Sequence, residues 1–318
     1  MATLMSVKAV GGAAPQARAR TGLPAVCGTM RGLAMTYRTI LTYFSGPESS
    51  GRTLAFAKSI ATTFDAHLTG IAALPRLPEP DGGGFYGSDV AFEAARQRVD
   101  ALIRQGESTR TLFEDGLRGE TFPHGWRFIH ADRADRLVAI LDHSDAADLV
   151  VVPQPEGRGP GRGPAGDDVR GLIIESGRPV LIVPPRWDGT SVGRDILLAF
   201  DGSREAVRAA FDAIPFLQRA DLVHIVWVDP VLPDDQDSSR AGDEIAKSLA
   251  RHGVTCETVE AHTQNEGVGD ELLTRARDYG SDLIVTGAFG HRGLREMVFG
   301  SVTDRMLKVP DLPVLMSN

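Results

Sequence analysis

The fold is decided by the stretch DLIVTGAFG, residues 282–290, which is followed by nine residues and then by Gly300 and Ser301. Residues 282–286 predict a buried strand, and residues 302–307 predict the start of a helix. Glycine lets the backbone approach a ligand closely, and free N–H groups at a helix start point towards negative charge. The stretch therefore predicts a cradle for a phosphate-bearing ligand.

Strands and helices alternate along most of the chain, and the same order occurs twice. In the second copy we expect strands at 196–200, 222–228, 255–260, 283–287 and 314–316, with helices at 203–219, 241–252, 267–279 and 302–307. In the first copy we expect strands at 40–44, 67–72, 126–129, 148–152 and 179–183, with helices at 51–65, 90–112, 135–143 and 168–176. This alternation predicts an α/β fold in which helices cover both faces of a parallel sheet.

The sequence divides into two predicted domains, 36–185 and 194–318, joined by a linker at 186–193. Residues 1–34 contain no Asp or Glu and are rich in Ala, Gly and Arg. We expect this segment to be a disordered tail or a misassigned start, with the true start at Met30 or Met35. A targeting peptide is the alternative, because such peptides are rich in Arg and poor in acidic residues.

Composition excludes several classes of function. The net charge of −8 argues against a general nucleic-acid binder. No apolar run reaches the ~18–20 residues that span a bilayer, so we expect no membrane partner. The two cysteines, Cys27 and Cys256, lie far apart and indicate neither a disulfide framework nor a metal site. They fit a reducing environment, and we expect a cytoplasmic protein.

A second loop is expected beside the glycine loop. In a doubly wound sheet, ligands bind outside the carboxyl ends of the strands where the strand order reverses. Asp201, at the end of a predicted strand, can accept hydrogen bonds from ribose or adenine, or help to hold a metal. Ser203 is either a helix N-cap or a ligand contact. Gly287 and Gly290 would let the loop wrap phosphates, and Gly300 and Ser301 would offer donors at the helix start.

The glycine spacing resembles the nucleotide-binding motif of the universal stress protein family, which is Gly, two residues, Gly, nine residues, Gly and then Ser or Thr. This sequence matches the motif without a gap. The strand that ends at Asp201 resembles the family's opening strand with its ligand-side Asp, and Val228 matches a position whose backbone faces adenine. The resemblance implies an ATP site, with or without Mg²⁺, made by Asp201, Val228, Gly287, Gly290, Gly300, Ser301 and Val302.

The resemblance also implies two tandem Rossmann-like units of the adenine nucleotide alpha hydrolase type. Each unit would be a five-stranded parallel sheet of order 3-2-1-4-5. Their closing strands, at 179–183 and 314–316, would pair within one chain to give an intramolecular pseudo-dimer, with homodimer formation left open.

The first copy retains the predicted fold without the motif. Aligned on the strands, Ser45 takes the position of Asp201, Pro153 that of Gly287, and Glu156 that of the second motif glycine. Proline has no N–H to donate, and a glutamate would repel phosphate. We predict that the first copy does not bind ATP in the family's manner.

Other motifs carry less weight. A G-x-G-x-x-G match at Gly161, Gly163 and Gly166 lies in a Gly/Pro-rich segment, too far from a strand for a dinucleotide turn. A G-x-S-x-G match at 189–193 enters a strand instead of leaving one. His291 and Arg292 are either phosphate contacts or solvated side chains.

The expected function is that of a stress-response protein which binds ATP in its second domain for regulation. No Walker A lysine occurs, and no obvious general base or nucleophile indicates turnover. The alternatives are a weak ATPase or phosphate-ester hydrolase, and a scaffold that binds no nucleotide.

Overall fold

The computed structural model describes residues 35–75, 89–132, 134–155, 164–187, 192–228, 238–263, 267–289, 301–308 and 311–318. Residues 34–318 form one compact unit. We call residues 35–187 the N-terminal half and residues 192–318 the C-terminal half. Among the helices in the described ranges, none is both long and apolar enough to cross a membrane.

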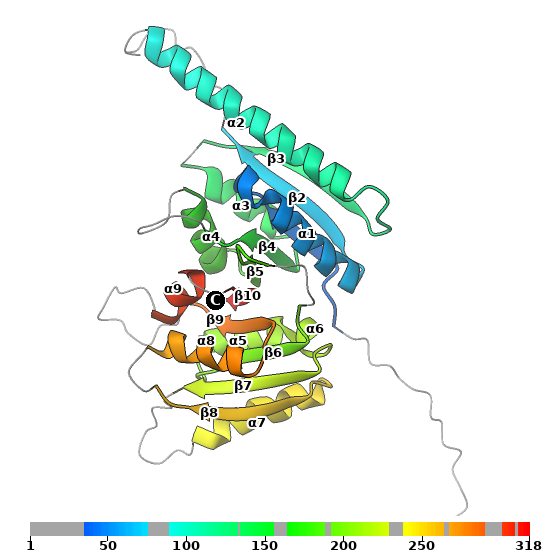
Figure 1. The fold of residues 1–318 in the computed structure, drawn as a ribbon, viewed down its shortest axis with the longest axis vertical. Coiled ribbons are helices and arrows are strands. Elements are labelled where there is room, and N and C mark those ends of the chain that lie inside the picture. The colour runs from blue at the N-terminus through cyan, green and yellow to red at the C-terminus, as the bar shows by residue number, and fades with distance from the viewer. Residues whose placement is uncertain are drawn as a thin grey trace, which may run out of the picture. The chain divides into compact units, whose positions relative to one another are not determined.

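The halves repeat one order of elements (Figure 1). The N-terminal half contains β1 (Thr39–Tyr43), α1 (Pro47–Phe64), β2 (His67–Leu74), α2 (Asp89–Gly116), β3 (His124–His130), α3 (Arg136–Ser144), β4 (Leu149–Pro153), α4 (Pro164–Glu175) and β5 (Val180–Val183). The C-terminal half contains β6 (Asp195–Ala199), α5 (Arg204–Asp212), α6 (Ile214–Leu217), β7 (Leu222–Val228), α7 (Ser238–Arg251), β8 (Cys256–Ala261), α8 (Val268–Asp278), β9 (Leu283–Gly287), α9 (Ser301–Lys308) and β10 (Val314–Ser317).

These strands form one ten-stranded sheet of order β3-β2-β1-β4-β5-β10-β9-β6-β7-β8. Each half therefore has the predicted order 3-2-1-4-5, and all pairs within a half are parallel. The halves meet where β5 and β10 pair antiparallel, with Leu181 opposite Leu315 (Figure 1). The predicted pairing of the two closing strands within one chain is confirmed.

Both faces of the sheet are buried at its central strands, whereas the edge strands β3 and β8 are partly exposed. In β4, Leu149 and Val151 join one apolar cluster, whereas Val150 and Val152 join the other. The first cluster contains residues of α1, α2, α5 and α7, and the second contains residues of α3, α4, α8 and α9. Each fully buried Val or Leu stabilises the fold by about 1.5–3 kcal/mol relative to exposure. The predicted helix layers on both faces are confirmed.

One predicted helix is wrong in its extent. The sequence pattern favoured a single helix over 203–219, but α5 ends at Asp212 and a separate short helix, α6, follows. Pro215 lies in the first turn of α6. Proline lacks the N–H that continues a helix ladder and its ring clashes with the preceding turn, so the helix is interrupted here.

Candidate functional site

The ends of β6 and β9 form the centre of the candidate site. The two strands are adjacent and parallel, with Ala199 opposite Thr286. On its other edge β6 pairs with β7. The strands that follow β6 in the chain therefore lie on one side of it and β9 lies on the other, so the strand order reverses between the ends of β6 and β9. Asp201 follows β6 directly and Gly287 ends β9. The structure thus brings together these two predicted site residues.

A cavity of about 230 Å³ opens at this edge. Its lining is largely apolar, from Ala199, Val226, Val228, Val268, Leu272, Phe289 and Val302 among others. Polar groups also line it, namely those of Asp201, Ser203, Glu205, Thr286 and Thr303. Ligand sites commonly combine an apolar wall with a few placed polar groups, which suits a flat ring carrying polar substituents. This volume is smaller than the ~300–1,000 Å³ of pockets that enclose a complete ligand. The cavity would therefore enclose only part of a molecule as large as a nucleotide.

Asp201 is exposed and held by its own loop. Its Oδ1 accepts a hydrogen bond from the Ser203 backbone N–H at 2.9 Å, whereas its Oδ2 forms no hydrogen bond with any residue in the described ranges. Between them, Gly202 has a φ of +71°, the left-handed region that glycine tolerates best. The turn therefore fixes the carboxylate at the mouth of the cavity and leaves one oxygen for a ligand.

Ser203 is the N-cap of α5. Its hydroxyl accepts a hydrogen bond from the Ala206 N–H at 3.1 Å, and its backbone is extended, as in other N-caps. Of the two interpretations left open by the sequence, the structure supports the cap. Ser203 still borders the cavity, so the cap also sets the position of the cavity wall.

Gly287 is needed for packing. A Cβ atom built on it would lie 2.6 Å from the Ala206 nitrogen and 2.6 Å from the Glu205 carbonyl carbon. The first turn of α5 therefore lies directly on the end of β9, which a side chain would prevent. In the N-terminal half, the matching final residue of a strand is Pro153.

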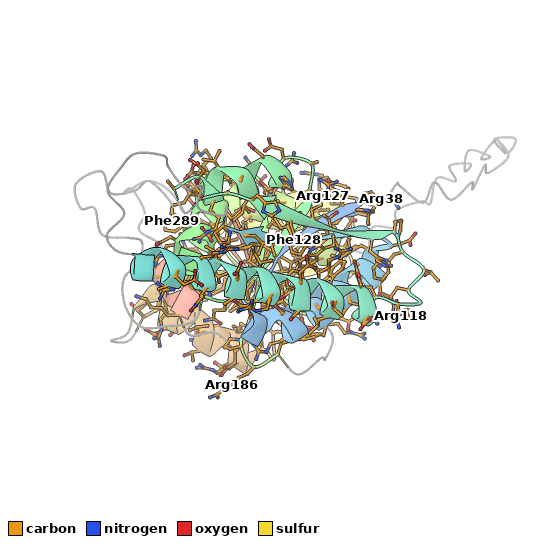
Figure 2. The ribbon with its side chains drawn as sticks, turned by 90° about the horizontal axis from the view of Figure 1, so that it is seen from above. Arg38, Arg118, Arg127, Phe128, Arg186 and Phe289 are labelled. Carbon is orange, nitrogen blue, oxygen red and sulfur yellow. The ribbon has the colours of Figure 1, made fainter. Side chains whose placement is uncertain are left out.

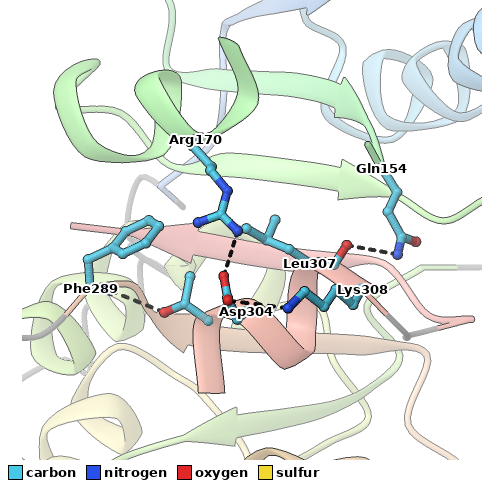
Figure 3. Close-up of polar contacts among 7 residues, drawn as sticks. Gln154, Arg170, Phe289, Asp304, Leu307 and Lys308 are labelled. Carbon is cyan, nitrogen blue, oxygen red and sulfur yellow. Dashed lines mark hydrogen bonds and ion pairs between the residues drawn. The ribbon is translucent and has the colours of Figure 1, made fainter. Parts of the chain in front are cut away.

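The chain after β9 is anchored to the first turn of α9. Phe289 has a φ of +55°, an uncommon value for a residue with a side chain. Its N–H donates to the Thr303 hydroxyl at 3.2 Å (Figure 3). This contact brings the start of the predicted glycine loop to the N-terminus of α9, where helix N–H groups lack intrahelical partners.

The remaining predicted residues are placed in part. Val228 and Val302 line the cavity, and Ser301 is the first residue of α9. Gly290 and Gly300 lie outside the described residues, as do His291, Arg292 and Glu156.

Sequence reasoning missed Glu205. It lies in the first turn of α5, lines the cavity and is only 4% exposed. Its Oε1 lies 3.1 Å from Nη2 of Arg204, whose side chain is largely exposed. The helix dipole favours an acidic residue in the first turn of a helix. The position of Glu205, two residues after the N-cap Ser203, was therefore the signal in the sequence that could have pointed to it. Its burial in the cavity wall depends on the packing against Gly287.

Polar contacts connect α9 to the N-terminal half (Figure 3). Arg170 on α4 pairs with Asp304 at 2.5 Å, and the Gln154 side-chain amide donates to the Leu307 carbonyl at 3.0 Å. Burial raises the pKa of Asp304, but the hydrogen bonds and positive charges of Arg170 and Lys308 outweigh it and hold that pKa below its usual value. The helix that borders the cavity is therefore fixed to the other half through charged and backbone groups.

The titratable groups in the described lining of the cavity are carboxylates. The described lining residues include two carboxylates and no His, Cys or Lys. In the described part of the chain, His, Cys, Asp and Glu side chains form no group of three or more that could hold a metal ion.

Comparisons with known proteins agree with this architecture. The Universal stress protein family matches residues 193–318. A universal stress protein of Synechocystis is 30% identical over 298 residues, a match that covers 87% of this chain and 99% of that protein. A universal stress protein of Mycolicibacterium smegmatis is 28% identical over 245 residues, covering 71% and 82% respectively. A universal stress protein from Archaeoglobus fulgidus has the same fold, with a TM-score of 0.62 at 15% identity and coverage of 88% of this chain and 98% of its own.

Proposed function

The chain belongs to the universal stress protein family, and from this premise we propose that its C-terminal half binds ATP for regulation instead of turnover. The observation that carries the proposal is the cavity at the strand-order reversal. It is bordered by the Asp201 carboxylate, by the end of β9 and by the N-terminus of α9. Ligands of doubly wound sheets bind at this position.

The residues present fit an adenine nucleotide. Val226 and Val228 offer an apolar surface for the base. The free Oδ2 of Asp201 is an acceptor for ribose hydroxyls. The first turn of α9, from Ser301 through Val302, offers N–H groups and a positive dipole end to phosphates. The motif residues Gly287, Gly290 and Gly300 would allow the backbone to approach those phosphates closely.

The described residues that line the cavity form no metal site of their own, so we expect any Mg²⁺ to enter bound to the nucleotide. Mg²⁺ is commonly held by substrate phosphates, waters and one or two carboxylates. Because the Oδ2 of Asp201 is assigned to the ribose, we expect the phosphates and waters to hold a nucleotide-borne ion.

Regulation follows from the position of α9. A nucleotide at its N-terminus would bias a helix that Arg170 and Gln154 hold from the other half. We propose that residues 36–185 and 194–318 act as two domains of an intramolecular pseudo-dimer, joined by 186–193 and by the β5–β10 pairing. The first domain would then respond to nucleotide without binding it in the same manner.

The test combines nucleotide identification with thermal unfolding. Mass spectrometry of nucleotide released from freshly purified protein should detect ATP. Added ATP at about 100 times its Kd should stabilise the fold by ~2.7 kcal/mol, a rise in Tm of roughly 4–8 °C. Asp201→Ala should abolish most of that rise. Asp221→Ala is the matched control, because Asp221 is an exposed aspartate paired with Arg194 before β7, outside the cavity.

Two results would contradict the proposal. An ATP-dependent rise that Asp201→Ala leaves unchanged would refute the site. Repeated turnover of ATP that disappears in Asp201→Ala would replace regulation with hydrolysis.

A further inference from the structure

A second hollow lies in the N-terminal half. Its volume is about 590 Å³, within the ~300–1,000 Å³ of small-molecule sites. It opens at the carboxyl ends of β1 and β2, between α2 and α3. α2 runs beside β3, the strand that carries Arg127 and Phe128 (Figure 2). The N-terminal half thus retains a hollow at the edge where the C-terminal half has its cavity.

The floor of this hollow is a polar trio in which Tyr43 and Asp168 are buried and Arg136 is half-buried. The Tyr43 hydroxyl donates to Asp168 at 2.8 Å, and Arg136 approaches the same carboxylate with Nε at 2.8 Å and Nη2 at 3.0 Å. Tyr43 is 3% exposed and Asp168 is 3% exposed. Arg136 therefore neutralises Asp168, and the trio forms a closed floor.

This floor differs from that of the C-terminal cavity. Aligned on the strands, Tyr43 occupies the position of Ala199, so a large phenol replaces a methyl group. The neighbouring strand in the sheet, β4, ends in Pro153, which has no N–H to offer a phosphate. The chemistry of the hollow is therefore not that of the nucleotide site.

One wall is a single face of α2. Arg98, Leu102, Gln105 and Thr109 all line the hollow, and their spacing of four, three and four residues places them on the same helix face. Gly106 allows that helix to approach β2, since a Cβ there would lie 2.6 Å from the Leu74 side chain. Leu102 remains 41% exposed.

The hollow carries an excess of positive charge. Its described lining includes Arg98, Arg136 and a single acidic residue, Asp168. Because Asp168 is paired with Arg136, no acidic side chain of the described lining balances the positive charge of Arg98. The Arg98 side chain forms no ion pair or hydrogen bond with another described residue.

The start of α1 adds to this preference. Its N-cap, Gly46, borders the hollow and provides no side-chain cap, whereas the matching helix α5 is capped by Ser203. Pro47, the first residue of α1, has no N–H to donate, so the helix dipole and the N–H groups after Pro47 are what an anion would meet there. Around them, Phe44, Leu74 and Leu102 supply apolar surface.

We propose that this hollow is a second ligand site, which takes a small organic anion with an apolar body. The acidic group lies near Arg98, and the body packs against the apolar lining made by Phe44, Leu74 and Leu102. The two halves would then bind different classes of ligand, and this site does not depend on nucleotide binding in the C-terminal half.

The experiment uses two fluorescent probes that share a ring system, on the full-length protein. Anilinonaphthalene sulfonate carries the anionic group, and N-phenylnaphthylamine is its neutral counterpart. We expect the sulfonate to bind one saturable site per chain. Arg98→Gln should weaken its binding about tenfold, through loss of one charge-assisted contact, and leave the neutral probe unchanged. Leu102→Glu should weaken both probes.

Arg104→Gln is the matched control, because Arg104 is exposed on the same helix and does not line the hollow. Arg98 and Leu102 are also exposed, and a thermal melt of each variant checks that the fold is retained. Equal sulfonate affinity in Arg98→Gln and Arg104→Gln would overturn the proposal. Displacement of the sulfonate by ATP would also overturn it, since the probe would then occupy the C-terminal cavity.

Discussion

Replacing Gly287 with alanine should destabilise the protein by forcing two backbone segments apart. The added Cβ would lie 2.6 Å from the Ala206 nitrogen and from the Glu205 carbonyl carbon, and both neighbours are backbone atoms that cannot rotate away. Reaching the 3.4 Å of an ordinary contact requires α5 to move by about 0.8 Å. Overpacking of this kind costs about 1–3 kcal/mol. That loss corresponds to a fall in Tm of roughly 2–9 °C.

Calorimetry and urea unfolding measure this loss, with Gly242→Ala as the control. Gly242 lies within α7, and the atoms nearest to its added Cβ are 3.7 Å away. Alanine there should be neutral or stabilise by about 0.5–1 kcal/mol, because glycine is a poor helix former. If Gly287→Ala unfolds at the wild-type temperature, then α5 does not depend on the close approach to β9, and the packing argument is wrong.

Two further predictions concern α5 and α9. Ser203→Ala should lower the free energy of unfolding by about 1 kcal/mol through loss of the N-cap, whereas Ser203→Asp should retain most of it; equal urea midpoints for the alanine variant and the wild type would argue against the cap. Asp304→Asn should lower stability at pH 7 by about 0.5–1 kcal/mol, as expected for a partly exposed ion pair. The folded-state pKa of Asp304 lies below its ordinary value, so this contribution is present above about pH 4 and is lost as the pH falls through the folded pKa. Urea midpoints at pH 7 and near pH 2 measure it, with Asp311→Asn as an exposed control; a difference that persists unchanged at the lower pH would contradict the assignment.

Prediction from sequence worked best where local pattern and burial coincide. The apolar runs at 148–152 and 283–287 are strands because both of their faces are covered, and a strand of that kind has a continuous apolar sequence. The pattern was less informative at Pro215. Helical periodicity continues through 203–219, although one missing N–H divides it into α5 and α6.

The candidate site was predictable in part. Asp201 follows the first strand of the second copy and Gly287 ends the fourth, and these two strands are neighbours in the 3-2-1-4-5 order, so their proximity followed from that order. Glu205 was not predictable in this way. An acidic residue in a first helical turn is usually exposed, and here it is buried only because α5 lies against Gly287.

The sequence by itself determined the alternation of strands and helices, the repeat, and the edge of the sheet at which Asp201 and Gly287 lie. Strands and helices are recognised by apolar residues that recur about every two or every 3.6 residues, and the site by short motifs. Both are local properties of the chain. Only the tertiary structure decided that Gly287 makes room for α5, that α9 is held by Arg170 and Gln154, and that the N-terminal half has a hollow of different chemistry. The physical reason is that each of these depends on distances between groups far apart in sequence, which are set by the packing of helices on the finished sheet.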